Sequence, residues 1–283
     1  MVSSIPELAS EFKKDAAEIE TILSDCSQKL LIERDKRVRP GLDDKILTSW
    51  NALMITGYLD AYRAFENQSY LQSALDNAQF IVDNLMDKDG RLDRNFKDGK
   101  SSINAFLDDY ALLSQAFLNL YEVTFDVKWI NLSEKLTDYA IAHFYNEESK
   151  MFDYTSDLDP PLIAKKAEYN DNVIPASNSA MARSLFKLGT LKYNVDHIDI
   201  AEQMLKNMVE QMLGSDYLSF YSNWGQLLLD FVKPPYEIAI VGEDALEKRK
   251  ELAKHYLGNS IILGTEGEEN LDLLKDKTQE GST

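Results

Sequence analysis

The amphipathic helices of this chain recur in pairs, and no other feature of the sequence restricts the possible folds as much. Apolar residues at helical spacing predict pairs at roughly 44–65 with 69–87, 104–124 with 127–145 and 177–192 with 195–213, and a seventh helix from Asn223. The turn inside each pair is short, whereas the segments between pairs are long. Helices joined by short turns are antiparallel neighbours, so we predict an α/α array whose long loops all lie at one end.

The end of the chain has a different pattern. Pro234 and Pro235 stop the last helix of the array, and the segments YEIAIVG and NSIILG flank a helix from about Asp244 to Tyr256. A strand, a helix and a strand in this order predict a small βαβ unit on an otherwise all-α fold. We therefore divide the chain into an N-terminal helical segment (1–36), the array (37–232), the βαβ unit (233–264) and a polar tail (265–283).

Composition narrows the partners and the compartment. The 283 residues carry a net charge of −18, and so acidic a surface repels nucleic-acid backbones and anionic membranes, neither of which we expect as a partner. A single cysteine excludes an internal disulfide or a CxxC motif. Neither a signal peptide nor a membrane-spanning stretch is recognisable, which predicts a cytoplasmic protein.

Carboxylates gather at the predicted long-loop end of the array. The catalytic candidates lie at the starts of the first helices of two pairs: Asp43, Asp44, Asp108 and Asp109. Glycosyl chemistry needs two carboxyl groups, one protonated and one ionised, roughly 5–10 Å apart. Aspartates also stabilise helix starts as caps, and Asp43 or Asp44 is placed to cap the helix predicted from residue 44. Both interpretations stay open at the level of the sequence.

Aromatic and amide side chains at the same end suit a sugar ligand, because sugar rings present apolar C–H faces to aromatic rings. The candidates for substrate binding are Trp50, Asn51, Tyr110, Tyr154, Asp171, Ser177, Asn178 and Trp224. Helical aromatics are also typical of a protein core, and the asparagines and the serine can equally cap helices. If the first helices of all pairs surround a common axis, these side chains converge on one mouth.

No cofactor or metal signature accompanies these residues. His143, His197 and His255 are far apart in the repeat, and no pair of them has the spacing of metal ligands. The sequence has no P-loop, GxGxxG or GxSxG motif. We expect the chain to hold neither a metal nor a cofactor.

Three segments carry a family resemblance: RVRPGLDDKILTSWNALMI, NAFLDDYALLSQAFLNLYE and DNVIPASNSAMARSLFKL. In this order they resemble motifs of long thioredoxin-domain-containing proteins, whose vertebrate members are of the spermatogenesis-associated protein 20 type. The resemblance runs from about Arg34 to Gly264. It implies an (α/α)6 toroid similar to those of N-acylglucosamine 2-epimerases and six-hairpin glycosidases, preceded by a thioredoxin-like domain.

The same resemblance implies a partial toroid, because seven array helices cannot close a ring of twelve. We expect the chain to be a C-terminal portion, without the thioredoxin-like domain and the first hairpins. An open half-toroid exposes apolar edges, so we also expect it to associate with the missing part or with a second copy of itself.

Two functions follow as hypotheses. The first is a carbohydrate-handling domain related to sugar epimerases and glycosidases, with the aspartates as acid–base groups. The second is a non-catalytic binding or scaffolding module that accompanies a thioredoxin-like domain. Carboxyl pairs well beyond ~10 Å apart, or already locked to lysine or arginine, favour binding over catalysis. A further expectation is that the isolated chain is incomplete and has no activity.

Overall fold

The computed structural model describes residues 3–160, 163, 165–267, 271–275 and 277. Its contacts divide the chain into two units, Met1–Asp44 and Lys45–Thr283. The first unit holds α1 (Ile5–Phe12) and α2 (Ala16–Asp35). Among its described residues Ile19 is the buried apolar side chain, so this unit has no sizeable core of its own.

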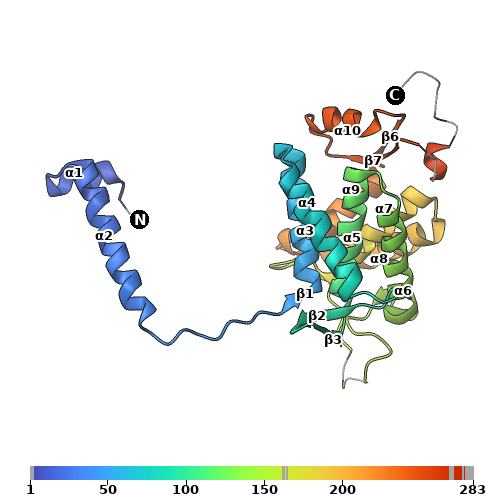
Figure 1. Ribbon diagram of the computed structural model, residues 1–283. Coiled ribbons are helices and arrows are strands. Elements are labelled where there is room, and N and C mark those ends of the chain that lie inside the picture. The colour runs from blue at the N-terminus through green and yellow to red at the C-terminus, as the bar shows by residue number, and fades with distance from the viewer. Residues whose placement is uncertain (1–2, 161–162, 164, 268–270, 276, 278–283) are drawn as a thin grey trace. The chain divides into compact units, whose positions relative to one another are not determined.

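The second unit contains the predicted helix pairs (Figure 1). Its array helices are α3 (Thr48–Phe65), α4 (Gln68–Asn84), α5 (Leu107–Thr124), α6 (Lys128–Phe144), α7 (Ser177–Lys192), α8 (Val195–Leu213) and α9 (Ser222–Val232). The odd-numbered helices are neighbours of one another, and each even-numbered helix packs on the odd helix before it. The odd helices therefore form an inner layer, which confirms the predicted α/α architecture.

The turn inside each pair is built in the same way three times. Helices α3, α5 and α7 end in residues with positive φ, which are Glu66 (54°), Phe125 (55°) and Tyr193 (52°). An asparagine or aspartate follows directly, and its side chain accepts a hydrogen bond from the first turn of the next helix. Residues other than glycine seldom adopt this left-handed conformation, so its recurrence at equivalent positions identifies a true structural repeat.

The long connections contain short strands that the sequence analysis assigned to loops. The segment predicted as a polar loop at 88–102 forms a hairpin of β2 (Asp93–Lys97) and β3 (Lys100–Asn104), and β1 (Ile46–Leu47) pairs with β2. Asp98 and Gly99 both have positive φ, as a tight hairpin turn requires, and the Asp-Gly pair is the sequence signal for it. The connection before α7 holds β4 (Tyr145–Asn146) and β5 (Met151–Phe152).

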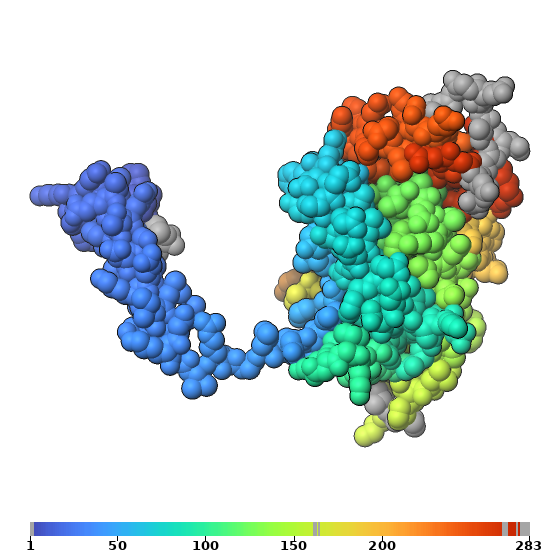
Figure 2. Space-filling view, viewed as in Figure 1, coloured from blue at the N-terminus to red at the C-terminus, as the bar shows by residue number. Residues whose placement is uncertain are grey.

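The C-terminal βαβ unit is confirmed. Strands β6 (Tyr236–Val241) and β7 (Ser260–Thr265) are parallel, and α10 (Ala245–Ala253) connects them. The unit lies at the end of the odd helices away from the β1–β3 sheet (Figure 1) and packs on α3 and α5. In the space-filling view its atoms, orange to red, rest directly on the helices (Figure 2).

The predicted polar tail is only partly described. Leu271, Leu273 and Leu274 are buried, and Asp272–Leu274 forms a 3-10 turn. This part of the tail therefore packs on the core. The other residues of the tail after Gly267 lie outside the described part of the chain, except Asp272, Lys275 and Lys277.

The contact between β7 and α5 is tight at Gly264, and it yields a stability prediction. A Cβ atom at this position would lie 2.5 Å from the Ile240 carbonyl oxygen and against the Phe125 ring. We expect Gly264→Ala to lower the free energy of unfolding by about 1–3 kcal/mol, since the backbone must move to admit the methyl group. Urea unfolding followed by circular dichroism measures this change.

Gly57 provides the matched control. It lies inside α3, and a Cβ atom there would have no neighbour within 4 Å. Gly57→Ala is expected to raise the free energy of unfolding by about 0.5–1 kcal/mol, because alanine favours the helix. Equal stability of the Gly264→Ala protein and the parent would contradict the close approach of β7 to α5.

Candidate functional site

Asp109, a predicted catalytic residue, holds two helix starts and a strand together. Its Oδ1 accepts a hydrogen bond from the Ser49 backbone N–H in the first turn of α3 (2.9 Å). Its Oδ2 accepts hydrogen bonds from the Phe106 N–H (3.0 Å) and from Nη1 of Arg94 in β2 (2.8 Å). The side chain is fully buried. The cap of α3 is therefore supplied by α5, 60 residues later in the chain.

Asp108 shares the same arginine. Nη1 of Arg94 lies 3.1 Å from Asp108 Oδ1, and the guanidinium also lies over the Phe106 ring. Burial, together with the charge of Asp108, raises the pKa of Asp109 to about 6, against the opposing effect of Arg94. Both carboxylates are thus already locked to an arginine, which favours a structural or binding role over acid–base catalysis.

Asp171 joins two further helix starts. Its Oδ1 accepts hydrogen bonds from the Ala176 N–H (3.0 Å) and the Ser179 hydroxyl (2.8 Å) at the start of α7. Its Oδ2 accepts one from the Asn223 N–H at the start of α9 (2.8 Å). This carboxylate is buried, so its acceptor positions serve the scaffold.

Several predicted substrate-binding residues belong to the core. Tyr110 and Trp224 are fully buried, with the Tyr110 hydroxyl accepting from the Leu92 N–H and the Trp224 indole donating to the Tyr169 carbonyl. Ser177 and Asn178 are buried too, and the Asn178 amide is paired with the Phe152 backbone. Their packing leaves no face open to a ligand.

The remaining candidates lie on different elements. Trp50 is 66% exposed on α3, and the Asn51 amide donates to the Leu47 carbonyl. Tyr154 is partly buried against Phe106, with ring centroids 5.0 Å apart. Asp43 and Asp44 precede α3 and belong to the first unit. The helix begins at Thr48 instead of residue 44, so the prediction that one of these aspartates caps it is wrong.

A cavity of about 290 Å³ lies between the odd helices and the segment before β7, away from the helix starts. The polar side chains that line it include Gln115 and Asn119 of α5, Arg183 and Lys187 of α7, Asp230 of α9 and Asn259. Thr56 adds a contribution from α3. All four inner helices therefore meet at this cavity, and the βαβ unit contributes to its wall.

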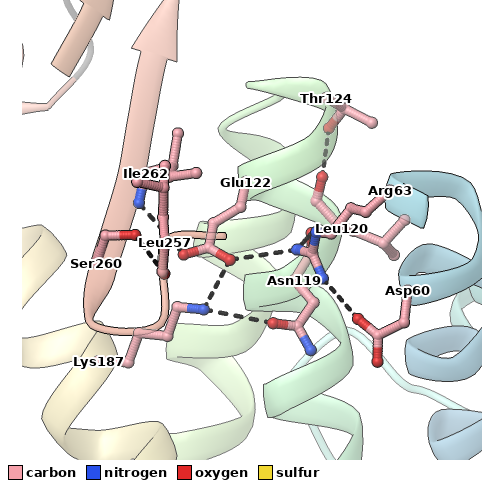
Figure 3. Close-up of polar contacts among 10 residues, drawn as sticks. All are labelled: Asp60, Arg63, Asn119, Leu120, Glu122, Thr124, Lys187, Leu257, Ser260 and Ile262. Carbon is pink, nitrogen blue, oxygen red and sulfur yellow. Dashed lines mark hydrogen bonds and ion pairs between the residues drawn. The ribbon is translucent and has the colours of Figure 1, made fainter. Parts of the chain in front are cut away.

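An ionic network supports one wall (Figure 3). Glu122 Oε2 lies 2.9 Å from the Lys187 ammonium and 3.3 Å from Nη2 of Arg63. Lys187 also donates to the Asn119 amide oxygen, and the Ile262 N–H of β7 donates to Glu122 Oε1. Burial lowers the pKa of Lys187, and Glu122 opposes this effect. The network connects α3, α5, α7 and β7.

Two other charged groups that line the cavity lack such pairing. Nη1 of Arg183 donates to the Asn223 side-chain oxygen (2.7 Å), but no carboxylate of the described residues lies within ion-pair distance of it. Asp230 likewise has neither a hydrogen bond nor an ion pair among the described residues. Burial raises the pKa of Asp230, and the nearby cations Arg183 and Lys187 partly offset this rise.

The cavity residues left a signal that the sequence analysis missed. Gln115, Asn119 and Glu122 recur at intervals of four and three in α5, and Arg183 and Lys187 are four apart in α7. Such spacing places polar groups on one face of an otherwise apolar inner helix. These polar residues lie away from the helix starts, where the candidate site was predicted.

The described residues were also compared with the requirements of a metal site and of a membrane-spanning helix. No group of three or more His, Cys, Asp or Glu side chains in this part of the chain is arranged to bind a metal ion. None of the helices within it has the length and apolar character needed to cross a membrane.

The contacts of Asp109 predict a stability effect. Asp109→Asn places an amide NH2 against N–H donors, so we expect the free energy of unfolding to fall by about 1–3 kcal/mol. Asp216→Asn, at an exposed position, is the control and should change it by less than about 0.5 kcal/mol. Chemical unfolding of the three proteins provides the measurement, and an unchanged Asp109→Asn protein would rule out the capping role.

The raised pKa of Asp109 predicts a pH dependence. The unfolded chain ionises near the ordinary value of 3.8, whereas the folded protein keeps the proton to about 6. The contribution that this raised pKa makes to the free energy of unfolding is therefore complete below about pH 4, and it is lost as the pH rises through about 6. The stability advantage of the parent over Asp109→Asn should shrink between about pH 4 and pH 7 in urea unfolding. Asp108→Asn, which removes the neighbouring charge, should weaken this trend.

Comparison with known proteins gives relatives of much greater length. No family model matches the chain. It is 28% identical to an uncharacterized protein of Caenorhabditis elegans over 214 residues, covering 73% of this chain and 29% of that protein. It is 26% identical to human spermatogenesis-associated protein 20 over 219 residues, covering 74% of this chain and 28% of that protein. The chain thus spans less than a third of the length of these relatives.

Solved structures share the fold at low sequence identity. The GH76 α-mannanase of Bacteroides thetaiotaomicron matches with a TM-score of 0.53 and 14% identity, over 88% of this chain and 75% of that one. A D-mannose isomerase matches with a TM-score of 0.52 and 15% identity, over 74% of this chain and 58% of that one. The chain is therefore similar in sequence to part of spermatogenesis-associated protein 20, and it shares the fold of the α-mannanase and the D-mannose isomerase.

Proposed function

We propose that the second unit is a carbohydrate-handling domain that binds a sugar-sized ligand in the cavity between its inner helices. The observation that carries the proposal is the convergence of polar side chains from all four inner helices on one cavity. At about 290 Å³ the cavity is at the lower end of the ~300–1,000 Å³ range of ligand pockets, which suits a monosaccharide and excludes a long oligosaccharide.

The lining chemistry supports a polyhydroxylated ligand. The side-chain oxygens of Gln115 and Asn259 offer acceptors, since their nitrogens donate to backbone carbonyls. The Asn119 NH2 group offers donors, since its oxygen accepts from Lys187, and Phe186 adds an apolar ring. The fold shared with a mannanase and a D-mannose isomerase is compatible with this ligand class, although it does not specify a reaction.

Asp230 is the acid–base candidate if the domain catalyses a reaction, as a sugar epimerase, isomerase or glycoside hydrolase. It is the carboxylate among the lining residues, and burial raises its pKa above the ordinary value of an aspartate. The aspartates at the helix starts are less suited to this role, since Arg94 and backbone N–H groups already occupy their oxygens.

The second candidate function is a non-catalytic binding or scaffolding module that accompanies a thioredoxin-like domain. One observation favours it: Asp108 and Asp109, the adjacent carboxylates expected to catalyse, are both locked to Arg94. We also propose that exposed apolar side chains of α3 and α9, such as Met54 and Leu229, pack against further helices of a longer toroid.

Ligand binding tests the proposed function directly. Thermal unfolding and calorimetry with D-mannose, D-glucose and N-acetylglucosamine should show stabilisation by at least one sugar, because a ligand at ~100 times its Kd adds about 2.7 kcal/mol. Asp230→Asn should weaken binding at least about tenfold with little change in the unfolding midpoint, since its carboxylate has no partner to lose. The exposed variant Asp216→Asn serves as the control, and flat curves for every sugar would contradict the proposal.

A further inference from the structure

We propose that the ligand of the central cavity carries a small oxyanion, a carboxylate or a phosphate, and that Arg183 binds it. This inference rests on the proposed function and narrows it from sugars in general to acidic sugars. The starting point is a guanidinium that lines the cavity and has no carboxylate within ion-pair distance among the described residues.

Most of the hydrogen-bonding capacity of Arg183 is unused. A guanidinium has five N–H donors in a planar fork that matches carboxylate and phosphate oxygens. Among the residues that the structure describes, Arg183 makes one hydrogen bond, from Nη1 to the neutral side chain of Asn223. Burial lowers the pKa of Arg183, and Asp230 and Asp171 act on it only from beyond ion-pair distance. A partly buried cation is costly without a counter-ion.

Other arginines of this unit that are buried or partly buried show the contrast. Arg94 is paired with Asp108 and Asp109, and Arg63 is paired with Asp60 and Glu122. Arg249 lacks a carboxylate too, but its guanidinium lies over the Tyr62 ring, 5.5 Å from the centroid, and does not line the cavity.

Neither charged neighbour of Arg183 in the cavity supplies the missing anion. The Lys187 ammonium is matched by Glu122, which is held by Arg63 as well. Asp230 acts on Arg183 only from beyond ion-pair distance, so it does not pair with the guanidinium directly. Arg183 is therefore the uncompensated charge of the cavity, and a bound oxyanion would neutralise it.

The size of the cavity restricts the rest of the ligand. At about 290 Å³ it admits one small ring with its acidic group. The amide nitrogens of Gln115 and Asn259 donate to the Ala180 and Lys233 carbonyls, so it is their side-chain oxygens that can accept from the hydroxyls of that ring. Sugar acids and sugar phosphates both have this chemistry, and they differ in the geometry and charge of the oxyanion.

Calorimetry with D-glucose, D-glucuronate and D-glucose 6-phosphate tests the inference at one fixed ionic strength. We expect at least one of the two acidic sugars to bind about tenfold or more tighter than glucose, and the preferred one identifies the oxyanion. Arg183→Gln should weaken binding of that sugar roughly 10- to 100-fold, as loss of a charge-assisted hydrogen bond does, and change glucose binding less than about threefold.

Lys192→Gln is the matched control. It removes one positive charge from the same helix, at a side chain paired with Glu134 and not among those that line the cavity. This variant should bind all three sugars as the parent does. A second measurement uses the parent protein alone: inorganic phosphate should compete with the preferred acidic sugar, which does not depend on the folding of any variant.

The outcomes separate the two proposals. If glucose binds as tightly as both acidic sugars, if Arg183→Gln keeps the parent affinity, or if phosphate does not compete, the oxyanion site is wrong and the sugar-binding function stands. If none of the three sugars nor those of the neutral panel binds, both proposals fail together.

Discussion

The structure depends on buried carboxylates of one inner helix, α5, which bond to elements far away in the sequence. At its start Asp109 caps α3 and holds Arg94 of β2. Near its end Glu122 receives Lys187, Arg63 and the backbone of β7. A buried carboxylate is tolerable only when donors satisfy its oxygens. These requirements fix how the neighbouring helices and the βαβ unit pack on α5.

The two ends of the inner helices consequently differ in what their charges do. At the starts, backbone N–H groups, a hydroxyl and Arg94 donate hydrogen bonds to Asp108, Asp109 and Asp171. These carboxylates therefore stabilise the fold. Further along the helices, Arg183 and Asp230 face a cavity without partners of comparable strength. Chemistry with a ligand favours groups of the second kind, since a carboxylate that already accepts several hydrogen bonds must give up protein partners to act on a ligand.

Regular features of the fold were predictable because they are encoded locally. Helical periodicity identified the three pairs, and the prolines before YEIAIVG marked the βαβ unit, both of which are confirmed. The predicted start of the first array helix was wrong, because Ile46–Leu47 pairs with β2 as a strand and the cap of the helix comes from Asp109. The hairpin around Asp98 and Gly99 was missed, although its turn residues are a local signal.

The sequence by itself determined that this is an acidic array of antiparallel helix pairs with a short βαβ addition, since periodicity, turn residues and charge act over a few positions. Only the tertiary structure decided which polar residues serve the scaffold and which face a ligand. That distinction depends on partners about 60 residues apart, such as Ser49 with Asp109 and Arg63 with Glu122, and on whether a carboxylate comes within reach of Arg183. Burial and pairing belong to the packed molecule, because the free energy of a charge is set by its surroundings and not by its place in the chain.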